Sequence, residues 1–382
     1  MKILYINDQI FPNTETDGEQ IMQTVSTLSL NGAILTFLIP RSWRKKGVLV
    51  SELEKYYQIN GRFTVETVSS FFPSLRFFEK YGHAIRSLFS KKVKEADVIY
   101  SRNLPTIVMM LIFTKKPVVY ETFRNWPDQL FYMPLLFKWL GNRKKFLGAV
   151  LHSNFAAESY RKIGFPEHKL FPIHNGYDPE RIKPVLTKNE ARTLLQLPLN
   201  QKIITYTGNV SIQKGIGFLL DMAEKIQDSL FVIVGSKGDG EIEKRAANIK
   251  NVKIVSWQPF RETVPYLYAS DILIIPPTLS PLEKVGNTVL PIKTFLYMAS
   301  GRTIFAPQSP DLAEILDSGK NALLVKPDNL GVAVSSLNEL LKNEKMVKNL
   351  GETAQKDAEN LTYQKRAEQI ISFIKRALEG VK

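Results

Sequence analysis

The chain has 382 residues, no cysteine, and 51 basic against 37 acidic side chains, a net charge of +14. This length favours two domains with separate cores, and a 44% hydrophobic fraction excludes general disorder. Without cysteine there are no disulfides, thiolate zinc sites, iron–sulfur clusters or cysteine nucleophile. The apolar run that opens the chain is too short for a secretory signal, and no run approaches the roughly 20 residues of a membrane span. We therefore expect a cytoplasmic protein, possibly peripheral at the inner face of a membrane.

The positive charge is concentrated in the first half. Residues 1–175 carry 24 basic and 14 acidic side chains, whereas residues 176–382 carry 27 and 23. Segment 41–94 alone has 12 basic and four acidic side chains. This distribution favours an anionic partner for the first half, which at this stage could be a membrane, a nucleic acid or a substrate.

Short apolar runs alternate with helical patterns along the first half. A helix is predicted over Gln20–Leu30, where apolar residues recur every three to four positions. Continuously apolar strands separated by helices indicate a parallel sheet covered on both faces. The predicted strands are Ile3–Ile6, Ile34–Ile39, Val98–Tyr100, Val118–Tyr120 and Ala149–Leu151.

The second half repeats this architecture. A helix is predicted near Phe218–Ile226, and a linker near Asn175–Asn200 separates the two halves. The predicted strands are Ile203–Tyr206, Leu230–Val234, Val252–Val255, Ile272–Ile275 and Thr303–Ala306. Two doubly wound α/β domains would bind ligands at the carboxyl ends of their strands, facing a cleft.

Three glycine-containing loops could bind phosphate. Gly18 is predicted just ahead of the first helix, where backbone N–H groups could meet an anion, or it could simply make the turn. In residues 205–215 a strand ends at Gly208, and Lys214 precedes Gly215 and a helix. A lysine there can neutralise a diphosphate leaving group, although a solvated lysine is the default interpretation of so short a motif. The spacing is not that of a Walker loop.

The third loop follows the strand Ile272–Ile275. Residues 286–290 would supply backbone donors at the start of a helix opened by Pro291. Other motifs are weak: residues 231–240 lack the GxGxxG spacing, and no HExxH or DxD pair occurs. The four histidines are scattered, so no metal site is expected.

Taken together, these segments resemble glycosyltransferase family 4, whose members have the GT-B fold. The resemblance spans nearly the whole chain, and the string Asn175, Gly176 and Asp178 falls at the interdomain hinge as in that family. The segments that carry it are 151–184, 207–215, 231–239, 255–277 and 291–307, together with the opening strand and glycine loop.

The resemblance implies two Rossmann-like domains and retaining, metal-independent transfer of a hexosyl group from a UDP- or GDP-sugar, without a cofactor. It implies an N-terminal acceptor domain over 1–175 and a donor domain over 176–361. The terminal segment 362–382 would cross back to the first domain as a helix. The implied donor-binding residues are Gly18, Gly208, Asn209, Lys214, Gly235, Asn287, Thr288, Val289 and Leu290.

The sequence departs from the family pattern at several positions. Asn209 stands where the family usually has arginine, which leaves Lys214 of the basic pair. Leu296 and Thr288 stand where it has two glutamates, and we assign the role of a glutamate to the nearby Glu283, which lies outside the usual spacing. The residues assigned catalytic roles are Lys214, Glu121, Arg124 and Glu283. Phe123 replaces a histidine often found near the transferred sugar.

Two functions of different classes follow. The first is a glycosyltransferase that acts on a lipid-linked or cell-envelope polysaccharide acceptor, with 41–94 and 131–147 against an anionic membrane. The aromatic residues that support a membrane surface in 41–94 are Trp43, Phe71, Phe72, Phe77, Phe78 and Phe89, which could equally be core. The second function is a catalytically weakened GT-B protein that serves as a scaffold for an active enzyme. A GT-B epimerase or phosphorylase is a further option, and nucleic-acid binding is not expected because no recognition motif accompanies the charge.

Overall fold

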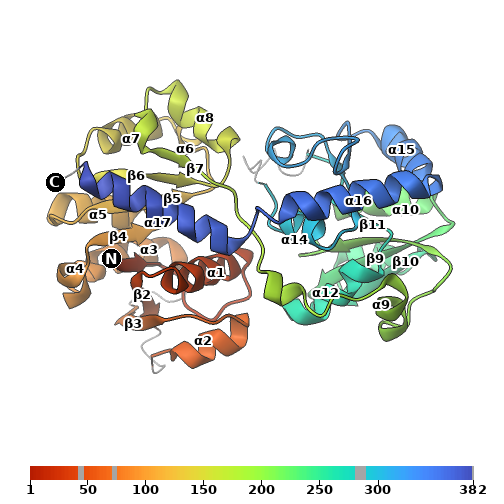
Figure 1. The fold of residues 1–382 in the computed structure, drawn as a ribbon, viewed down its shortest axis with the longest axis horizontal. Coiled ribbons are helices and arrows are strands. Elements are labelled where there is room, and N and C mark those ends of the chain that lie inside the picture. Colours follow the sequence, from red (N-terminus) through yellow and green to blue (C-terminus); the bar gives the residue numbers. More distant parts are fainter. Residues whose placement is uncertain (42–46, 71–74, 280–289, 381–382) are drawn as a thin grey trace. The chain divides into compact units, whose positions relative to one another are not determined.

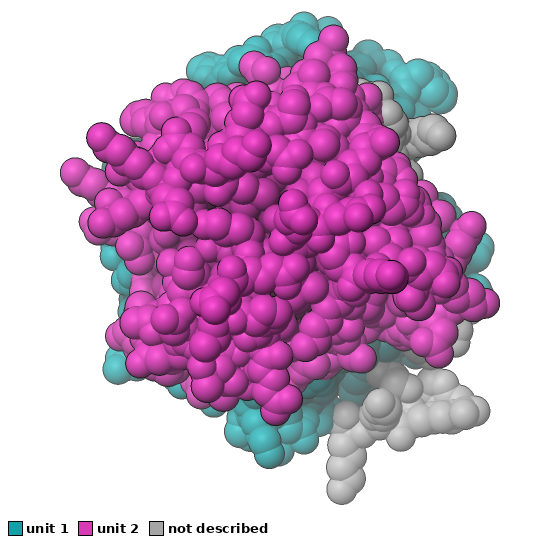
Figure 2. Space-filling view, turned by 90° about the vertical axis from the view of Figure 1, so that its right-hand side faces the viewer, with its two compact units in different colours: residues 1–174, 363–382 teal, residues 175–362 magenta. Residues whose placement is uncertain are grey.

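The computed structural model describes residues 1–41, 47–70, 75–279 and 290–380. The chain forms two compact units, drawn as a ribbon in Figure 1 and coloured separately in Figure 2. Unit 1 comprises residues 1–174 and 363–382, and unit 2 comprises residues 175–362. Each unit is described by itself below.

Unit 1 is built on a parallel sheet with the order β3-β2-β1-β4-β5-β6-β7 within the described residues. Its strands are β1 (Lys2–Ile6), β2 (Ile34–Arg41), β3 (Phe63–Ser69), β4 (Val98–Ser101), β5 (Val118–Thr122), β6 (Phe146–Leu151) and β7 (Leu170–Pro172). Its helices are α1 (Thr16–Leu30), α2 (Val50–Tyr57), α3 (Arg76–Ser87), α4 (Lys91–Glu95), α5 (Leu104–Phe113), α6 (Trp126–Gln129), α7 (Met133–Gly141), α8 (Asn154–Lys162) and α17 (Tyr363–Glu379), with the 3₁₀ turn η1 (Glu167–Lys169).

Every residue of the central strands β4, β5 and β6 is buried, which is why these strands are mostly apolar instead of alternating. The polar exceptions, Ser101, Glu121 and Thr122, lie at the carboxyl ends of β4 and β5. Helices cover both faces of the sheet (Figure 1). On one face Tyr5 of β1 stacks on its register partner Tyr100 of β4, with 5.1 Å between the ring centroids.

Helix α17 belongs to unit 1 although it ends the chain. Ile370 and Ile374 are fully buried in the same core cluster as residues of β1, β2 and α1. Phe373 stacks on Phe171 of β7 with 4.6 Å between ring centroids. The expected return of the terminal helix to the first domain is confirmed, because its amphipathic face completes this core.

Unit 2 contains a second parallel sheet with the order β10-β9-β8-β11-β12-β13 in the part of the chain that is described. Its strands are β8 (Lys202–Thr207), β9 (Ser229–Ser236), β10 (Val252–Ser256), β11 (Ile272–Ile274), β12 (Thr303–Pro307) and β13 (Leu323–Val325). Its helices are α9 (Lys188–Leu194), α10 (Ile216–Lys225), α11 (Glu241–Ala246), α12 (Phe260–Ala269), α14 (Lys293–Ala299), α15 (Leu330–Lys342) and α16 (Glu344–Ala358), with the 3₁₀ turns η2 (Pro179–Ile182), η3 (Ile212–Lys214) and η4 (Leu312–Glu314).

Successive residues of the central strands of unit 2 enter two different cores. Ile203 and Val232 belong to one hydrophobic cluster, whereas Ile204 and Phe231 belong to the other. This alternation follows from the period of two along a strand, and it shows that both faces of the sheet are covered. The α/β fold class with two Rossmann-like domains is confirmed.

Three edge strands escaped prediction, and two helix starts were misplaced. β7 and β13 have only three residues each, and β3 is mostly half-exposed, so none gives a continuous apolar run. Helix α1 begins at Thr16, so the prediction that Gly18 precedes it was wrong. Helix α14 begins at Lys293, two residues beyond Pro291.

Candidate functional site

The strand orders place a topological switch point in each sheet. In unit 1 the order reverses between β1 and β4, and in unit 2 it reverses between β8 and β11. Doubly wound sheets bind ligands outside the carboxyl ends of the strands at such a point, because neighbouring connections there diverge to opposite faces. The two sites are therefore sought at these positions.

At the unit 2 switch point, Gly208 directly follows β8, and the neighbouring β9 passes through Gly235. Both have positive φ, +133° and +119°, and a Cβ on Gly235 would overlap the carbonyl oxygen of Gly208. The Gly208 N–H donates to Val234 O at 2.9 Å, which holds the two strand ends together. Glycine at both positions keeps backbone groups accessible at the edge where a ligand would bind.

Lys214 ends the turn η3, and Gly215 leads into α10. A Cβ on Gly215 would overlap the side chain of Thr278, so this turn lies against the loop that follows β11. Lys214 itself is exposed and has no carboxylate partner among the described residues. The structure thus places a free cation beside the switch point, at the position predicted for a phosphate-binding lysine.

Asn209 is exposed and directly follows Gly208. Its backbone carbonyl accepts a hydrogen bond from Tyr206 Oη at 2.9 Å. Leu290 is 2% exposed and belongs to the core, which indicates a packing role for its side chain. Glu283, Asn287, Thr288 and Val289 lie outside the described residues.

Lys293, the first residue of α14, is the site residue that the motif analysis missed. Its Nζ lies 3.6 Å from the centroid of the Tyr206 ring, and 2.8 Å from the place that a Cβ on residue 208 would occupy. Four residues further along α14, Tyr297 Oη accepts a hydrogen bond from Thr207 N at 2.8 Å, which fixes α14 against the end of β8. The segment 291–307 contained the signal, since a lysine near the start of an otherwise apolar helix is unusual.

Unit 1 has a buried polar cluster near the carboxyl ends of its strands, formed by β5, β6 and α17. Glu121 Oε1 accepts from His152 Nε2 and from Arg366 Nη2, each at 2.8 Å. Gln20 Nε2 lies 3.2 Å from His152 Nδ1, and Gln20 Oε1 accepts from Arg102 at 3.1 Å. These contacts assign the Nε2–H tautomer to a neutral His152.

Burial and charge set the protonation of this cluster. Burial alone would raise the pKa of Glu121, but Arg366, His152 and Arg102 outweigh it and hold that pKa below its ordinary value. Burial lowers the pKa of His152 to about 4, against the opposing effect of Glu121. At neutral pH the cluster is therefore a carboxylate–guanidinium pair with a neutral imidazole.

Glu121 is only 1% exposed, and its main contacts attach α17 to the sheet. Arg124 packs over the rings of Phe123 and Trp126, at 5.4 and 4.9 Å from their centroids, and Phe123 lies 6.2 Å from the His152 ring. Gly18 is buried in the first turn of α1 against the Asn13 side chain. The structure thus brings Glu121, Phe123 and Arg124 near one strand end and places Gly18 inside a helix.

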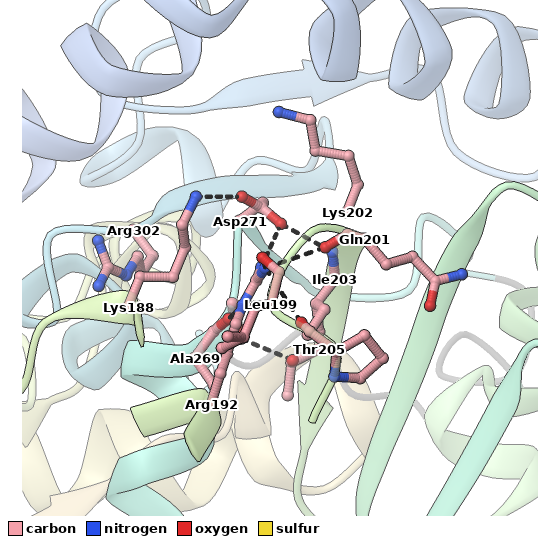
Figure 3. Close-up of polar contacts among 12 residues, drawn as sticks. Lys188, Arg192, Leu199, Gln201, Lys202, Ile203, Thr205, Ala269, Asp271 and Arg302 are labelled. Atoms are coloured by element: carbon pink, nitrogen blue, oxygen red, sulfur yellow. Dashed lines mark hydrogen bonds and ion pairs between the residues drawn. The ribbon is translucent and has the colours of Figure 1, made fainter. Parts of the chain in front are cut away.

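The opposite, amino-terminal edge of the unit 2 sheet carries a closed charge cluster, drawn in Figure 3. Asp271, just before β11, accepts from Lys188 Nζ at 2.8 Å, from Arg192 Nη2 at 2.6 Å and from Ile203 N at 2.8 Å. A pocket of about 710 Å³ beside it is lined by further basic residues, among them Lys202 and Lys348. Both are paired, with Glu344 at 2.8 Å and Glu352 at 3.7 Å respectively. Lys188, Arg192, Lys202 and Lys348 thus have acidic partners within the chain, and Arg302 donates to the backbone carbonyl of Tyr268.

Within the residues that the structure describes, no group of three or more histidine, aspartate or glutamate side chains is arranged to hold a metal ion. In the same residues, no helix is both long and apolar enough to cross a membrane.

Comparison with known proteins assigns a class to unit 2. Residues 201–343 match the family model described as Glycosyl transferases group 1. The chain is 25% identical over 166 residues to an uncharacterized glycosyltransferase, MJ1178, of Methanocaldococcus jannaschii, which covers 42% of this chain and 44% of that protein. It is 26% identical over 160 residues to the putative colanic acid biosynthesis glycosyl transferase WcaI of Escherichia coli, with 39% and 38% covered. The chain thus spans less than half the length of either of these curated relatives.

The fold is similar to that of a solved glycosyltransferase from Rickettsia africae, with a TM-score of 0.74 and 16% identity over 99% of this chain and 98% of that one. HepE from Anabaena, solved in complex with UDP, matches with a TM-score of 0.74 and 16% identity over 98% of this chain and 100% of that one. The fold is that of the GT-B glycosyltransferases, and unit 2 has the sequence pattern of a group 1 glycosyl transferase domain.

Proposed function

We propose that this protein is a glycosyltransferase that uses a nucleotide-sugar, a UDP- or GDP-sugar, as the donor. The observation that carries the proposal is the free Lys214 beside Gly208 at the switch point of unit 2, the unit that matches the group 1 glycosyl transferases. The UDP complex of the similarly folded HepE supports a nucleoside diphosphate as the leaving group.

The proposed chemistry needs charge stabilisation more than a nucleophile from the protein. When the bond between the anomeric carbon and the diphosphate breaks, negative charge builds up on the departing phosphate. A preorganised cation and backbone N–H groups stabilise that charge without reorganisation, and one such donor is worth about 10²–10³ in rate. We propose a retaining, metal-independent hexosyl transfer in which Lys214 has this role.

We further propose a lipid-linked or cell-envelope glycan as the acceptor, bound by unit 1 at an anionic membrane surface. Large aromatic side chains project from unit 1 into solvent: Phe77 is 66% exposed, Phe89 82% and Phe131 93%. Lys80, Lys91 and Lys94 are exposed nearby in the sequence. Exposed aromatic and basic side chains together favour the interface of an anionic bilayer.

Some aromatic residues of the segments predicted to meet the membrane do not contribute to this surface, or lie outside the described residues. Phe137 and Phe146 in segment 131–147 are fully buried and belong to the core of unit 1. Trp43, Phe71 and Phe72 lie outside the described residues. The proposed membrane surface therefore rests on α3, the segment just after it, and the residues that precede α7.

A thermal-shift screen of the full chain against UDP-, GDP- and ADP-sugars tests the donor class. A ligand at about 100 times its dissociation constant stabilises the folded protein by about 2.7 kcal/mol. The shift should appear with one nucleotide and persist with the sugar-free diphosphate. A chain that responds to none of them is not a nucleotide-sugar enzyme.

The alternative is a scaffold without catalysis, which is favoured by Asn209, Leu296 and Phe123 at positions where the family has arginine, glutamate and histidine. Leu296 packs against the core of unit 2 and is not part of a polar site. Sugar transfer or donor hydrolysis by the wild type, abolished in Lys214→Ala, would exclude a scaffold. Donor binding without any turnover would favour it.

A further inference from the structure

The ammonium group of Lys293 has no acidic partner in the part of the chain that the structure describes. Among the described residues no carboxylate bonds to its ammonium group, and the contact that stabilises the charge is the face of the Tyr206 ring, 3.6 Å away. An aromatic face compensates only part of the lost hydration of a cation. Lysines that have a structural role in this unit, such as Lys188 and Lys202, are paired with carboxylates instead.

Lys214 is a like charge acting on the same group. Burial, and then the charge of Lys214, lower the pKa of Lys293 well below its ordinary value. Asp328, on the loop beyond β13, bonds to Thr278 and to Leu279 N instead. Tyr206 and Tyr297 also adjoin this edge, and burial raises the pKa of both, so they stay neutral. Among the described residues, the two lysines therefore share one edge of the sheet without a carboxylate partner.

The two lysines lie around Gly208. Lys293 comes so close to Gly208 that any side chain at 208 would touch its ammonium group. Lys214 belongs to the turn that packs against the loop after β11, the other strand of the switch point. An anion held at the end of β8 would thus meet both cations.

We propose that Lys293 is the second cation of the diphosphate-binding site, where it works with Lys214 in place of a cation at position 209. The inference rests on the proposed function and specifies the donor site within it. It also has a consequence of its own. Burial and the like charge of Lys214 lower the pKa of Lys293 in the empty protein. A bound diphosphate supplies a counter-charge that raises this pKa again, which favours the uptake of a proton from solvent. Binding is then accompanied by proton uptake.

Isothermal titration calorimetry of the full chain at neutral pH tests whether Lys293 binds the diphosphate and whether binding is accompanied by proton uptake. Inorganic pyrophosphate, UDP and GDP are titrated in two buffers with different ionisation enthalpies, so that the difference in heat counts protons taken up. We expect uptake by the wild type. Lys293→Arg keeps a permanent charge, so it should bind without uptake. Lys293→Met should lose about tenfold to a hundredfold in affinity, the usual cost of losing a charged hydrogen-bond partner.

Lys202→Met is the matched control, because Lys202 begins the same strand, β8, at its opposite end. It should bind and take up protons as the wild type does. The melting temperature of ligand-free Lys293→Met should equal or exceed that of the wild type, since the variant removes a poorly solvated amine. A lower melting temperature with unchanged affinity would show that Lys293 is a structural cation, and would overturn the inference.

The remaining outcomes separate this inference from the proposed function. If the wild type binds a nucleoside diphosphate and Lys293→Met binds it equally well, the inference fails and the proposed function stands. If the wild type binds none of the three probes, the proposed function fails and the inference fails with it. Should Lys293→Met not fold, Lys293→Arg decides: undiminished proton uptake in that variant would exclude Lys293 as the group that titrates.

Discussion

In unit 2, the positively charged side chains at the amino-terminal ends of the strands are paired differently from those at the carboxyl-terminal ends. At the amino-terminal edge, Lys188 and Arg192 both bind the carboxylate of Asp271, as Figure 3 shows. At the carboxyl edge, Lys214 and Lys293 share a switch point without a carboxylate partner among the described residues. Strand β8 runs from one edge to the other, so the same scaffold supports both. Cations that pair with carboxylates of the chain stabilise the fold, whereas cations without such partners are available to bind an anionic ligand.

The largest expected effect is a loss of stability on removing the carboxylate of Asp271, the acidic group of the cluster in Figure 3. Asp271→Asn leaves the guanidinium of Arg192, only 2% exposed, without its carboxylate. Removing one partner of a buried ion pair costs about 3–5 kcal/mol, so we expect a loss of that size in the free energy of unfolding, measured by urea denaturation of unit 2. Affinity for nucleoside diphosphate in the folded protein should stay unchanged.

The control for this variant is Asp317→Asn, which removes an exposed ion pair with Lys320. Exposed pairs contribute about 0–1 kcal/mol, so little should change. Equal losses in the two variants would contradict the distinction between a balanced, buried cluster and surface charge.

The next effect is a loss of sugar transfer on removing Lys214, at the carboxyl ends of the unit 2 strands. Lys214→Ala should lower sugar transfer by about 10²–10³-fold, because it removes a donor that stabilises charge in the transition state. The melting temperature should not fall, since Lys214 is exposed and has no carboxylate partner among the described residues. Steady-state assays with the responsive nucleotide-sugar measure the loss, and Lys202→Ala at the far end of β8 should retain full activity. A fall in stability without a fall in transfer would contradict the assignment.

In unit 1, by contrast, the charged groups at the carboxyl ends of the strands are paired with each other: Glu121 binds Arg366, beside a neutral His152. Burial lowers the pKa of His152 to about 4 and that of His83 to about 3. The unfolded chain therefore binds more protons than the folded one as the pH falls below about 6.5, and stability is lost through the window from 6.5 to 4. The slope is about 1.4 kcal/mol per pH unit for each histidine.

Chemical denaturation of unit 1 at a series of pH values measures this slope. His152→Gln should reduce the slope of the free energy of unfolding against pH by the contribution of one histidine. His168→Gln should leave this slope unchanged, because His168 is exposed. A stability that stays flat between pH 6.5 and 4 would show that the buried histidines gain a proton without cost.

The smallest expected effect concerns the proposed membrane surface. Each exposed cation near an anionic bilayer contributes about 1 kcal/mol, so Lys91→Gln should weaken binding to anionic vesicles about fivefold. Phe89→Ser, at an 82% exposed position, should weaken it further without affecting the core. Flotation with anionic and neutral vesicles measures both, with Lys320→Gln in unit 2 as the control. Equal binding to the two vesicle types, or none, would contradict an electrostatic membrane surface.

The sequence by itself determined the central strands, because a strand buried on both faces is mostly apolar, and such apolar runs can be recognised without a structure. It also placed Gly208 and Lys214 together at a strand end, since glycine and lysine before a helix are a local pattern. The resemblance to glycosyltransferases came from the order of many such local segments. Edge strands such as β7 escaped, because three half-buried residues carry no periodicity.

Only the tertiary structure decided which charges are balanced. Glu121 looked catalytic in its strand motif, yet Arg366, 245 residues further along the chain, pairs with it. Lys293 looked like one more helix residue, yet the fold places its ammonium over Tyr206 and beside Gly208. The reason is physical: the pKa and the role of a buried group depend on neighbours in space, and sequence separation does not constrain those neighbours.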